Sequence, residues 1–167
     1  QKGSSQLGYV ETGSAAEVAG LRIGDQILEV NGRPVNSWLD FMTEAHLGAG
    51  QGVAVVKFLS NGEEKTAEVP LVHTDMGIYM IDGISKVTQC MILRVVPDSI
   101  AEKAGVLAGD LVQMLDGEPV LSPDQFVDLL RRQGLTAEAR RCTLSFQIAN
   151  PHLPAPRIAL LHAYREA

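Results

Sequence analysis

The chain repeats itself. Residues 13–35 and 98–120 align without gaps at an offset of 85 positions, and ten of these 23 positions carry the same residue. The same register continues to Ser37/Ser122 and Phe41/Phe126. Self-similarity at a fixed offset indicates duplicated structural units. A chain of 167 residues is therefore expected to hold two small domains rather than one large one.

Each copy begins with signals for a short helix, a strand and a tight turn. Ser14 and Ser99 are suited to accept a hydrogen bond from an unpaired helix amide, and a glutamate three residues later completes a capping box. A Gly-Asp turn then leads into expected strands at 26–30 and 111–115. The dipeptides that follow these strands, Asn31-Gly32 and Asp116-Gly117, are strong hairpin turns.

A longer helix and a final hairpin complete each copy. Ser37 and Ser122 are the expected N-caps of the longer helices, and apolar residues then recur on one helix face. These residues are Trp38, Phe41, Met42 and Ala45 in the first copy and Phe126, Leu129 and Leu130 in the second. Hairpins are expected at 53–71 and 142–164. The sequence therefore predicts the α+β class, as two partial β-barrels with a short and a longer helix each.

Composition limits what the two domains can bind. Hydrophobic residues make up 46% of the chain and aromatic residues only 5%, so Val, Leu, Ile and Met are expected to build the cores. The net charge of -6 argues against nucleic acid as a partner, because phosphate backbones are bound by clustered Lys and Arg. No stretch approaches the roughly 20 apolar residues of a transmembrane helix. Residues 1–5 resemble a trimmed or engineered terminus, so a longer parent protein is expected.

The two cysteines, Cys90 and Cys142, fall in two expected strands of the second copy. They are compatible with two buried thiols that pack as small hydrophobic residues. They are also compatible with a disulfide, if the strands are neighbours and the compartment is oxidising. The sequence leaves both alternatives open.

Catalytic and metal-binding motifs are missing from the sequence. It contains neither His-Glu-x-x-His nor Gly-x-Ser-x-Gly. The four histidines, His46, His73, His152 and His162, lack the spacing of a ligand cluster. Asp25 and Asp110 are the same turn residue repeated, and are interpreted as hydrogen-bonding residues of the turn. We therefore expect no catalytic residue, no metal and no cofactor in this chain.

Residues 14–32 and their second copy resemble the signature of PDZ domains. That signature runs small-Ala-x-x-Ala-Gly-Leu-x-x-Gly-Asp-x-Ile-x-x-Val-Asn/Asp-Gly. The resemblance extends from about Leu7 to Leu161 and implies two PDZ domains, expected at 6–75 and 76–165. The form with Ala-Gly-Leu ahead of Gly-Asp resembles bacterial envelope proteases more than eukaryotic scaffolds.

The resemblance also implies a binding site. PDZ domains hold an extended peptide between a groove strand and the longer helix, and backbone amides of a glycine-containing loop hold its carboxylate. Met76–Met80 resembles that loop and strand. The implied peptide-binding residues are Gly77, Ile78, Tyr79, Met80, Phe126, Leu129, Leu130, Phe41, Met42 and Ala45. The alternative is that Gly77 lies in an ordinary turn and that the helix residues belong to the cores.

Only one convincing groove strand, 77–82, is present for two units. In the strand order of HtrA-type serine proteases it belongs to the second unit, as the expected boundary at 76 implies. In the permuted order of RseP-like site-2 intramembrane zinc proteases it belongs to the first unit. Residues 34–41, with their Ser-Trp-x-x-Phe spacing, resemble the latter family, which we favour.

The expected function is a non-catalytic tandem module that recognises or filters protein segments for a bacterial envelope protease. Its expected partners are extended peptides or protein C-termini, and the catalytic domain of an RseP-like parent protease. The expected location is periplasmic or extracytoplasmic, with tethering to the inner membrane only through the parent. Alternatives are the tail of an HtrA-type protease, a scaffolding pair with degenerate grooves, and an enzyme with an unrecognised site.

Overall fold

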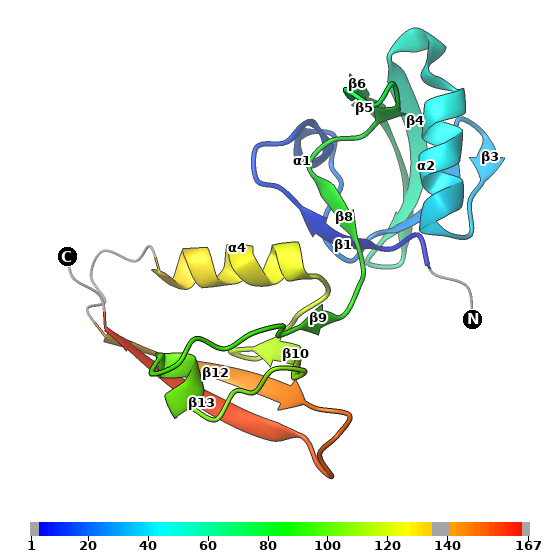
Figure 1. Ribbon diagram of the computed structural model, residues 1–167. Coiled ribbons are helices and arrows are strands. Elements are labelled where there is room, and N and C mark those ends of the chain that lie inside the picture. The colour runs from blue at the N-terminus through cyan, green and yellow to red at the C-terminus, as the bar shows by residue number, and fades with distance from the viewer. Residues whose placement is uncertain (1–3, 135–140, 165–167) are drawn as a thin grey trace. The chain divides into compact units, whose positions relative to one another are not determined.

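The computed structural model describes residues 4–134 and 141–164 (Figure 1). The chain divides into two compact units, Gln1–Val87 and Thr88–Ala167. The division lies twelve residues later than the boundary expected after residue 75. Residues 76–87 lie in the first unit because they pair with its strands and contact its longer helix, as described below.

The described residues of the first unit, from residue 4 onward, form eight strands, two α-helices and a 3-10 turn. Its longest sheet has the order β3-β2-β4-β5, and two further strand pairs, β6-β7 and β1-β8, lie beside it. The elements in chain order are β1 (Leu7–Val10), α1 (Ala15–Val18), β2 (Gln26–Val30), β3 (Arg33–Pro34), α2 (Trp38–Leu47), η1 (Ala49–Gln51), β4 (Val53–Ser60), β5 (Glu63–Pro70), β6 (Val72–His73), β7 (Tyr79–Met80) and β8 (Ile84–Lys86).

The second unit repeats the first part of this plan. Its sheet has the order β11-β10-β12-β13, and β9 also pairs with β10. The elements are β9 (Cys90–Met91), α3 (Ile100–Lys103), β10 (Leu111–Leu115), β11 (Glu118–Pro119), α4 (Pro123–Gly134), β12 (Arg141–Ala149) and β13 (Arg157–Tyr164). The predicted α+β class is confirmed in both units.

The repeated signature forms the same capped helix twice. Ser14 Oγ accepts a hydrogen bond from the Glu17 amide at 3.2 Å, and Glu17 Oε1 accepts one from the Gly13 amide at 3.0 Å. Ser99 and Glu102 repeat both bonds in the second unit at 3.2 and 3.0 Å. These paired bonds satisfy amides that a helix N-terminus otherwise leaves free. Both predicted capping boxes are confirmed.

Each unit has its own hydrophobic core, built mainly from aliphatic residues. The first core contains Leu7, Ala16, Leu21, Ile27, Val30, Val35, Phe41, Ala45, Ala54, Val56, Phe58, Val69 and Ile81. The second contains Cys90, Val106, Val112, Leu115, Leu129, Leu144, Phe146, Ile148, Ala159 and Leu161. Ile81 comes from the segment that was expected in the second domain, and its burial in the first core anchors that segment there.

The pairing of β1 with β8 closes the first unit and depends on a glycine. The strands are antiparallel, with Leu7 opposite Lys86 and Val10 opposite Ile84, and their register shifts at residue 8. A Cβ atom at Gly8 would lie 2.4 Å from the Lys86 carbonyl oxygen, a separation that side chains do not tolerate. A glycine at a bulge allows this close backbone approach.

Candidate functional site

The candidate site is the junction of β7 with α2 in the first unit. β7 pairs with β6 through Tyr79 opposite His73 and Met80 opposite Val72. On its other side, the Tyr79 amide donates a hydrogen bond to His46 Nδ1 of α2 at 3.1 Å. The His46 and Tyr79 rings are stacked, with their centroids 6.1 Å apart. The helix and the predicted groove strand are therefore joined by a direct bond.

The backbone amides of the loop between β6 and β7 are hydrogen-bonded within the loop. The Gly77 amide donates to the Thr74 carbonyl oxygen at 2.9 Å, and the Ile78 amide donates to Thr74 Oγ1 at 3.2 Å. The Thr74 amide in turn donates to the Ile78 carbonyl oxygen at 2.8 Å. Gly77 has a φ of 80°, which glycine adopts without a steric cost. The successive amides of residues 77–79 therefore all have acceptors within the first unit.

The predicted residues of α2 divide between two faces of the helix. Phe41 and Ala45 are each 1% exposed and lie in the first core. Met42 and His46 are half-buried and lie four residues apart, so they share the neighbouring face, where His46 contacts β7. In position, Phe41 and Ala45 are therefore core residues, and Met42 lies on the face that approaches the predicted groove strand.

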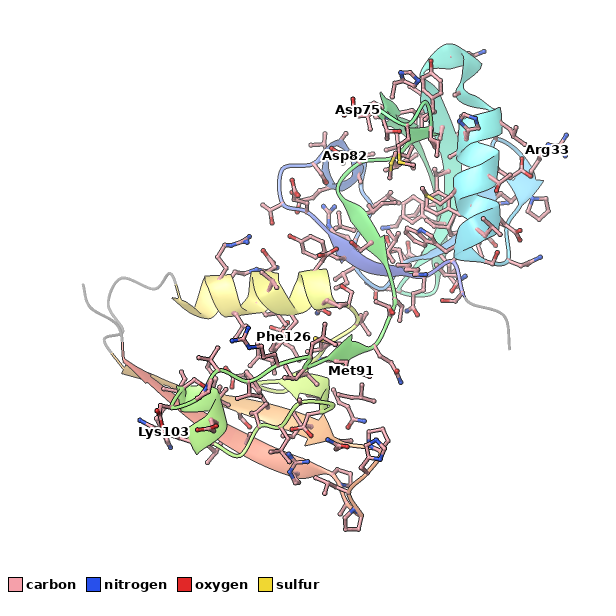
Figure 2. All side chains as sticks on the ribbon, viewed as in Figure 1. Arg33, Asp75, Asp82, Met91, Lys103 and Phe126 are labelled. Carbon is pink, nitrogen blue, oxygen red and sulfur yellow. The ribbon has the colours of Figure 1, made fainter. Side chains whose placement is uncertain are left out.

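Apolar and acidic side chains surround the loop. Met76 and Ile78 are 84% and 40% exposed. Asp75, in the loop between β6 and β7, and Asp82, just after β7, are exposed as well (Figure 2). The sequence has no Lys or Arg between residues 65 and 86. A ligand at this loop would meet backbone amides, apolar side chains and imidazoles, without a permanently charged cation from this segment.

The predicted residues of α4 lie in a different unit from residues 77–80. Leu129 is buried in the second core, and Phe126 and Leu130 pack against that core. The Phe126 ring meets the Phe146 ring edge-on at 5.4 Å, and Figure 2 shows Phe126 pointing from α4 toward the strands. Residues 77–80 therefore lie in the same unit as the predicted binding residues of α2. The predicted binding residues of α4 lie in the other unit. Among the described residues of the second unit, no strand plays the part of β7.

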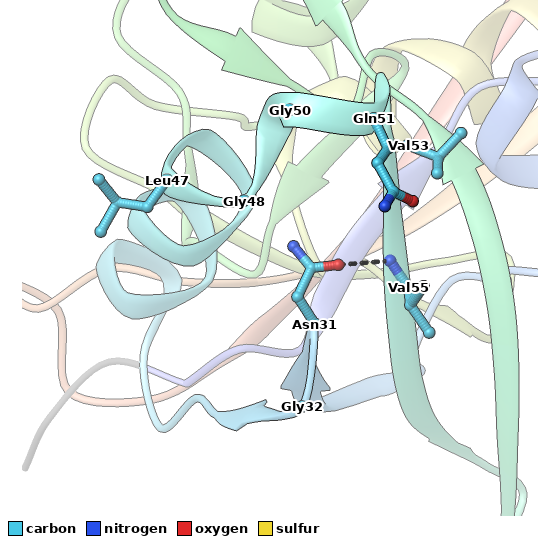
Figure 3. A pocket seen from close by; sticks show the side chains of 8 residues that line it. All are labelled: Asn31, Gly32, Leu47, Gly48, Gly50, Gln51, Val53 and Val55. Carbon is cyan, nitrogen blue, oxygen red and sulfur yellow. Dashed lines mark hydrogen bonds between the residues drawn. The ribbon is translucent and has the colours of Figure 1, made fainter.

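A separate pocket of about 570 Å³ lies at the C-terminal end of α2. Its lining residues are Asn31, Gly32, Leu47, Gly48, Gly50, Gln51, Val53 and Val55 (Figure 3). The Asn31 side chain accepts a hydrogen bond from the Val55 amide at 2.9 Å, so its oxygen already has a partner (Figure 3). The predicted peptide-binding residues do not line this pocket, and we assign it no ligand.

Cys90 is a free cysteine, and its side chain is buried in the second core. Burial raises the pKa of the Cys90 thiol, as expected for a group removed from water. The side chain of Cys142 lies outside the described residues. In this structure Cys90 is therefore a buried core thiol.

Across residues 4–134 and 141–164, no group of three or more His, Cys, Asp or Glu side chains is arranged to hold a metal ion. In the same part of the chain, no helix has the length and hydrophobicity required to cross a membrane.

Two residues of the site, His46 and Thr74, were not identified from the sequence. A signal for His46 was present, because it lies one helical turn after Met42 on the predicted binding helix. Thr74 precedes Ile78 by four residues, and its hydroxyl accepts a hydrogen bond from the Ile78 amide, as threonine hydroxyls do in turns. Both side chains accept hydrogen bonds from backbone amides of the site. A pattern of apolar residues does not indicate such polar acceptors.

One comparison with known proteins identifies a family. A family model described as a PDZ domain matches residues 7–47 and 91–138. A Neisseria meningitidis serogroup A protein named "Putative zinc metalloprotease" is 30% identical over 150 residues, or 86% of this chain. This chain spans 33% of the length of that relative. The PDZ domain of an SdrC-like protein from Listeria monocytogenes is 22% identical, with a TM-score of 0.44, over 52% of this chain and 90% of that domain.

Proposed function

This chain belongs to the PDZ domain family, and on that premise we propose that its first unit binds the free carboxyl ends of extended peptides between β7 and α2. PDZ domains generally bind peptides by adding them as a strand to a sheet edge. The observation that carries the proposal is the run of amides at residues 77–79, which lies in a glycine-containing loop beside α2. Successive backbone amides in such a turn form a site for an anion.

The apolar side chains near this loop support a preference for a hydrophobic last residue. Ile78 and Met76 are exposed beside the amides, and Met42 lies on the α2 face that approaches β7. The last side chain of a peptide whose carboxylate is held by the loop would enter the space between this helix face and the strand. A hydrophobic side chain would be favoured there, because it removes apolar surface from water.

The role in a parent protein is proposed as substrate recognition or filtering by a membrane zinc protease. Residues 77–82 belong to the first unit, which is the strand order of the RseP-like proteases, and a relative named as a zinc metalloprotease supports the same choice. An extracytoplasmic location is part of this proposal.

The direct test compares pairs of short fluorescein-labelled peptides that differ only in a free carboxylate or an amide at the C-terminus. Anisotropy with the whole chain should show that the free carboxylate binds at least about tenfold more tightly, since hydrogen bonds to charged groups contribute more than neutral ones. Equal affinity for the two peptides would contradict carboxylate recognition.

Replacing Ile78 with Asp should weaken binding of the carboxylate peptide by at least about tenfold, because a charge is brought to an apolar surface beside an anion. Val18→Asp is the matched control, because Val18 is an exposed apolar residue of α1 in the same unit. It should leave the affinity unchanged. Equal losses in both variants would show that Ile78 is no part of the site.

A further inference from the structure

One bond of the candidate groove conflicts with peptide binding. A peptide that joins β7 on the side of α2 needs the Tyr79 amide as a donor, because strand addition uses the backbone groups of the edge. In the structure that amide already donates to His46 Nδ1 at 3.1 Å. The imidazole thus takes the place of a ligand acceptor, and a ligand must displace it.

The bond requires one protonation state of the imidazole. Nδ1 can accept a hydrogen bond only while it carries no proton, so in this structure the neutral ring holds its proton on Nε2. Protonation makes both ring nitrogens donors, and two donors then face each other at Tyr79. The hydrogen bond between the Tyr79 amide and His46 therefore forms only while His46 is neutral.

The bond of the Ile78 amide opens more easily than that of the Tyr79 amide. The Ile78 amide donates to the hydroxyl of Thr74 at 3.2 Å, and a hydroxyl side chain can rotate away. His46 is more constrained, because its ring also stacks on Tyr79 and is half-buried. Among the acceptors of the three amides, the His46 imidazole is the one that can take up a proton.

The charges on the elements around His46 are either paired or acidic. On α2, Glu44 lies 3.8 Å from Arg33. On β2, which packs on α2, Glu29 lies 3.6 Å from Lys57. The η1 turn has no ionisable residue. The remaining ionisable residues are Asp40 in the first turn of α2, which accepts a hydrogen bond from the Asn36 amide, Tyr79 in β7, His73 in β6 with its ring 4.5 Å from that of Tyr79, and the exposed Asp75 and Asp82.

Neither the segment between residues 65 and 86 nor α2 contains Lys or Arg, so the positive charge that these two segments can supply comes from their histidines. While His46 and His73 are neutral, Asp75 and Asp82 give the loop region a negative character that opposes an incoming carboxylate. Protonation of His46 both frees the Tyr79 amide and supplies a cation where the carboxylate would bind.

We propose that His46 is a proton-controlled gate of the first groove, which blocks the Tyr79 amide when neutral and admits a peptide carboxylate when protonated. This inference rests on the proposed function, since it assigns the regulation of the same site. Peptide binding should accordingly be accompanied by proton uptake, and the affinity should rise as the pH falls through the titration of His46.

The first experiment tests the bond without a peptide. NMR of the full chain, labelled with nitrogen-15, should show scalar coupling between the Tyr79 amide nitrogen and His46 Nδ1 while the imidazole is neutral. The coupling should disappear as the imidazole titrates. Absence of the coupling at pH values above that titration would overturn the gate, whatever the peptides do.

The second experiment measures the affinity of the fluorescein-labelled carboxylate peptides above and below the measured titration of His46. Wild-type affinity should rise by about three- to tenfold on acidification, the range expected for one hydrogen bond. His46→Ala should bind tightly at both pH values. His46→Asn keeps an acceptor that does not titrate, and should lose the pH dependence. His152→Asn, an exposed histidine of the second unit, should retain it.

The possible outcomes separate the two proposals. If peptides bind but the pH dependence survives in His46→Asn, or is lost in His73→Asn instead, the gate is overturned and the proposed function stands. If no carboxylate peptide binds to the wild-type chain or to His46→Ala at either pH, the proposed function is overturned and the gate with it.

Discussion

The two units form the same backbone bonds around their Gly-Asp turns but differ in what pairs with the strand beside them. In the first unit the Leu7 amide donates to the Asp25 carbonyl oxygen at 2.8 Å, and the Ile92 amide repeats this bond to Asp110 at 2.8 Å. Beyond that point β1 pairs with β8, whereas no strand is paired with 92–95 among the described residues. The repeated signature thus specifies the scaffold, and the groove depends on a segment outside it.

Single residues at equivalent positions carry this difference. Gly8 allows the close approach of β8, and its counterpart in the second unit, Leu93, is 83% exposed. At the turn carboxylates it is the second unit that has the additional interactions. Asp25 accepts a hydrogen bond from the Arg22 amide at 2.8 Å, and Asp110, besides the equivalent bond, pairs with Arg157 at 2.8 Å and with Asn150 at 3.0 Å. The first unit is closed by a strand, and the second is reinforced by an ion pair between the buried Asp110 and the partly exposed Arg157.

The largest expected effect compares a fully buried with a partly buried aromatic residue, at the equivalent positions Phe41 and Phe126. Phe41→Ala should destabilise the first unit by about 3–5 kcal/mol, because the side chain is 1% exposed and a cavity remains. Phe126→Ala should cost the second unit less, because Phe126 is only partly buried. Denaturant unfolding followed by NMR signals of each unit measures both. Equal costs would contradict the assignment of Phe41 to the core.

The next effect concerns the turn carboxylates. Asp110→Asn should destabilise the second unit by about 3 kcal/mol, because it leaves the guanidinium of Arg157 without its anion. Asp25→Asn should cost the first unit only about 1 kcal/mol, the contribution of a single hydrogen bond. The same unfolding experiment tests this ratio.

The carboxylate of Asp110 also predicts how stability depends on pH. Burial by itself would raise the pKa of Asp110, but hydrogen bonds from Arg157, the Leu107 amide and Asn150 outweigh it and hold the pKa below its ordinary value. A lowered pKa stabilises the fold above the unfolded value of about 3.9, and this contribution is lost as the pH falls through the folded value. The Asp110→Asn variant should lack this acid-dependent loss of stability. An equal decline of the free energy of unfolding with falling pH in the variant and the wild type would contradict the prediction.

Exchanging the residues at positions 8 and 93 should give a smaller effect that differs between the units. Gly8→Leu should cost the first unit about 1–3 kcal/mol and release β8, because its side chain would collide with the Lys86 backbone. Leu93→Gly should change the second unit by less than about 1 kcal/mol, because Leu93 is exposed. Amide exchange at residues 84–86 reports the release. Protected amides in Gly8→Leu would show that the glycine is not required.

The smallest expected effect is at Cys90, whose counterpart is Ser5. The Ser5 hydroxyl is buried and donates to the Ile27 carbonyl oxygen at 2.7 Å. Cys90→Ser should therefore cost the second unit no more than about 1 kcal/mol, because the new hydroxyl can donate to the equivalent carbonyl of Val112. Thermal unfolding measures the change. A cost of several kcal/mol would show that the two sites are not equivalent.

Local signals in the sequence predicted the parts of the fold that local bonds determine. The capping boxes at Ser14 and Ser99 are confirmed, and so are the turns at Asn31-Gly32 and Asp116-Gly117, where both residues have positive φ. The assignment of 77–82 to a unit was beyond such signals, because it depends on the pairing of β8 with a strand at the other end of the unit.

Only the local part of the candidate site could be predicted from the sequence. The loop around Gly77 was identified from its glycine and its apolar neighbours, and its role in binding stays a prediction. The spacing of apolar residues alone could not assign the residues of α2 to the core or to the groove, because Phe41 and Met42 are consecutive and lie on neighbouring faces of one helix. His46 was passed over because its importance comes from the Tyr79 amide, which the chain brings to it only in the folded unit.

The pairing of β1 with β8 also sets the order in which the first unit can be completed on the ribosome. β1 is among its first elements to be synthesised and β8 is the last, so the edge of β1 stays without its partner until nearly the whole unit has emerged. Contacts between distant parts of a chain form late, because the intervening loop must first be closed. The Tyr79 amide reaches α2 in the same late stretch of synthesis, so a nascent first unit has neither a finished sheet nor a groove.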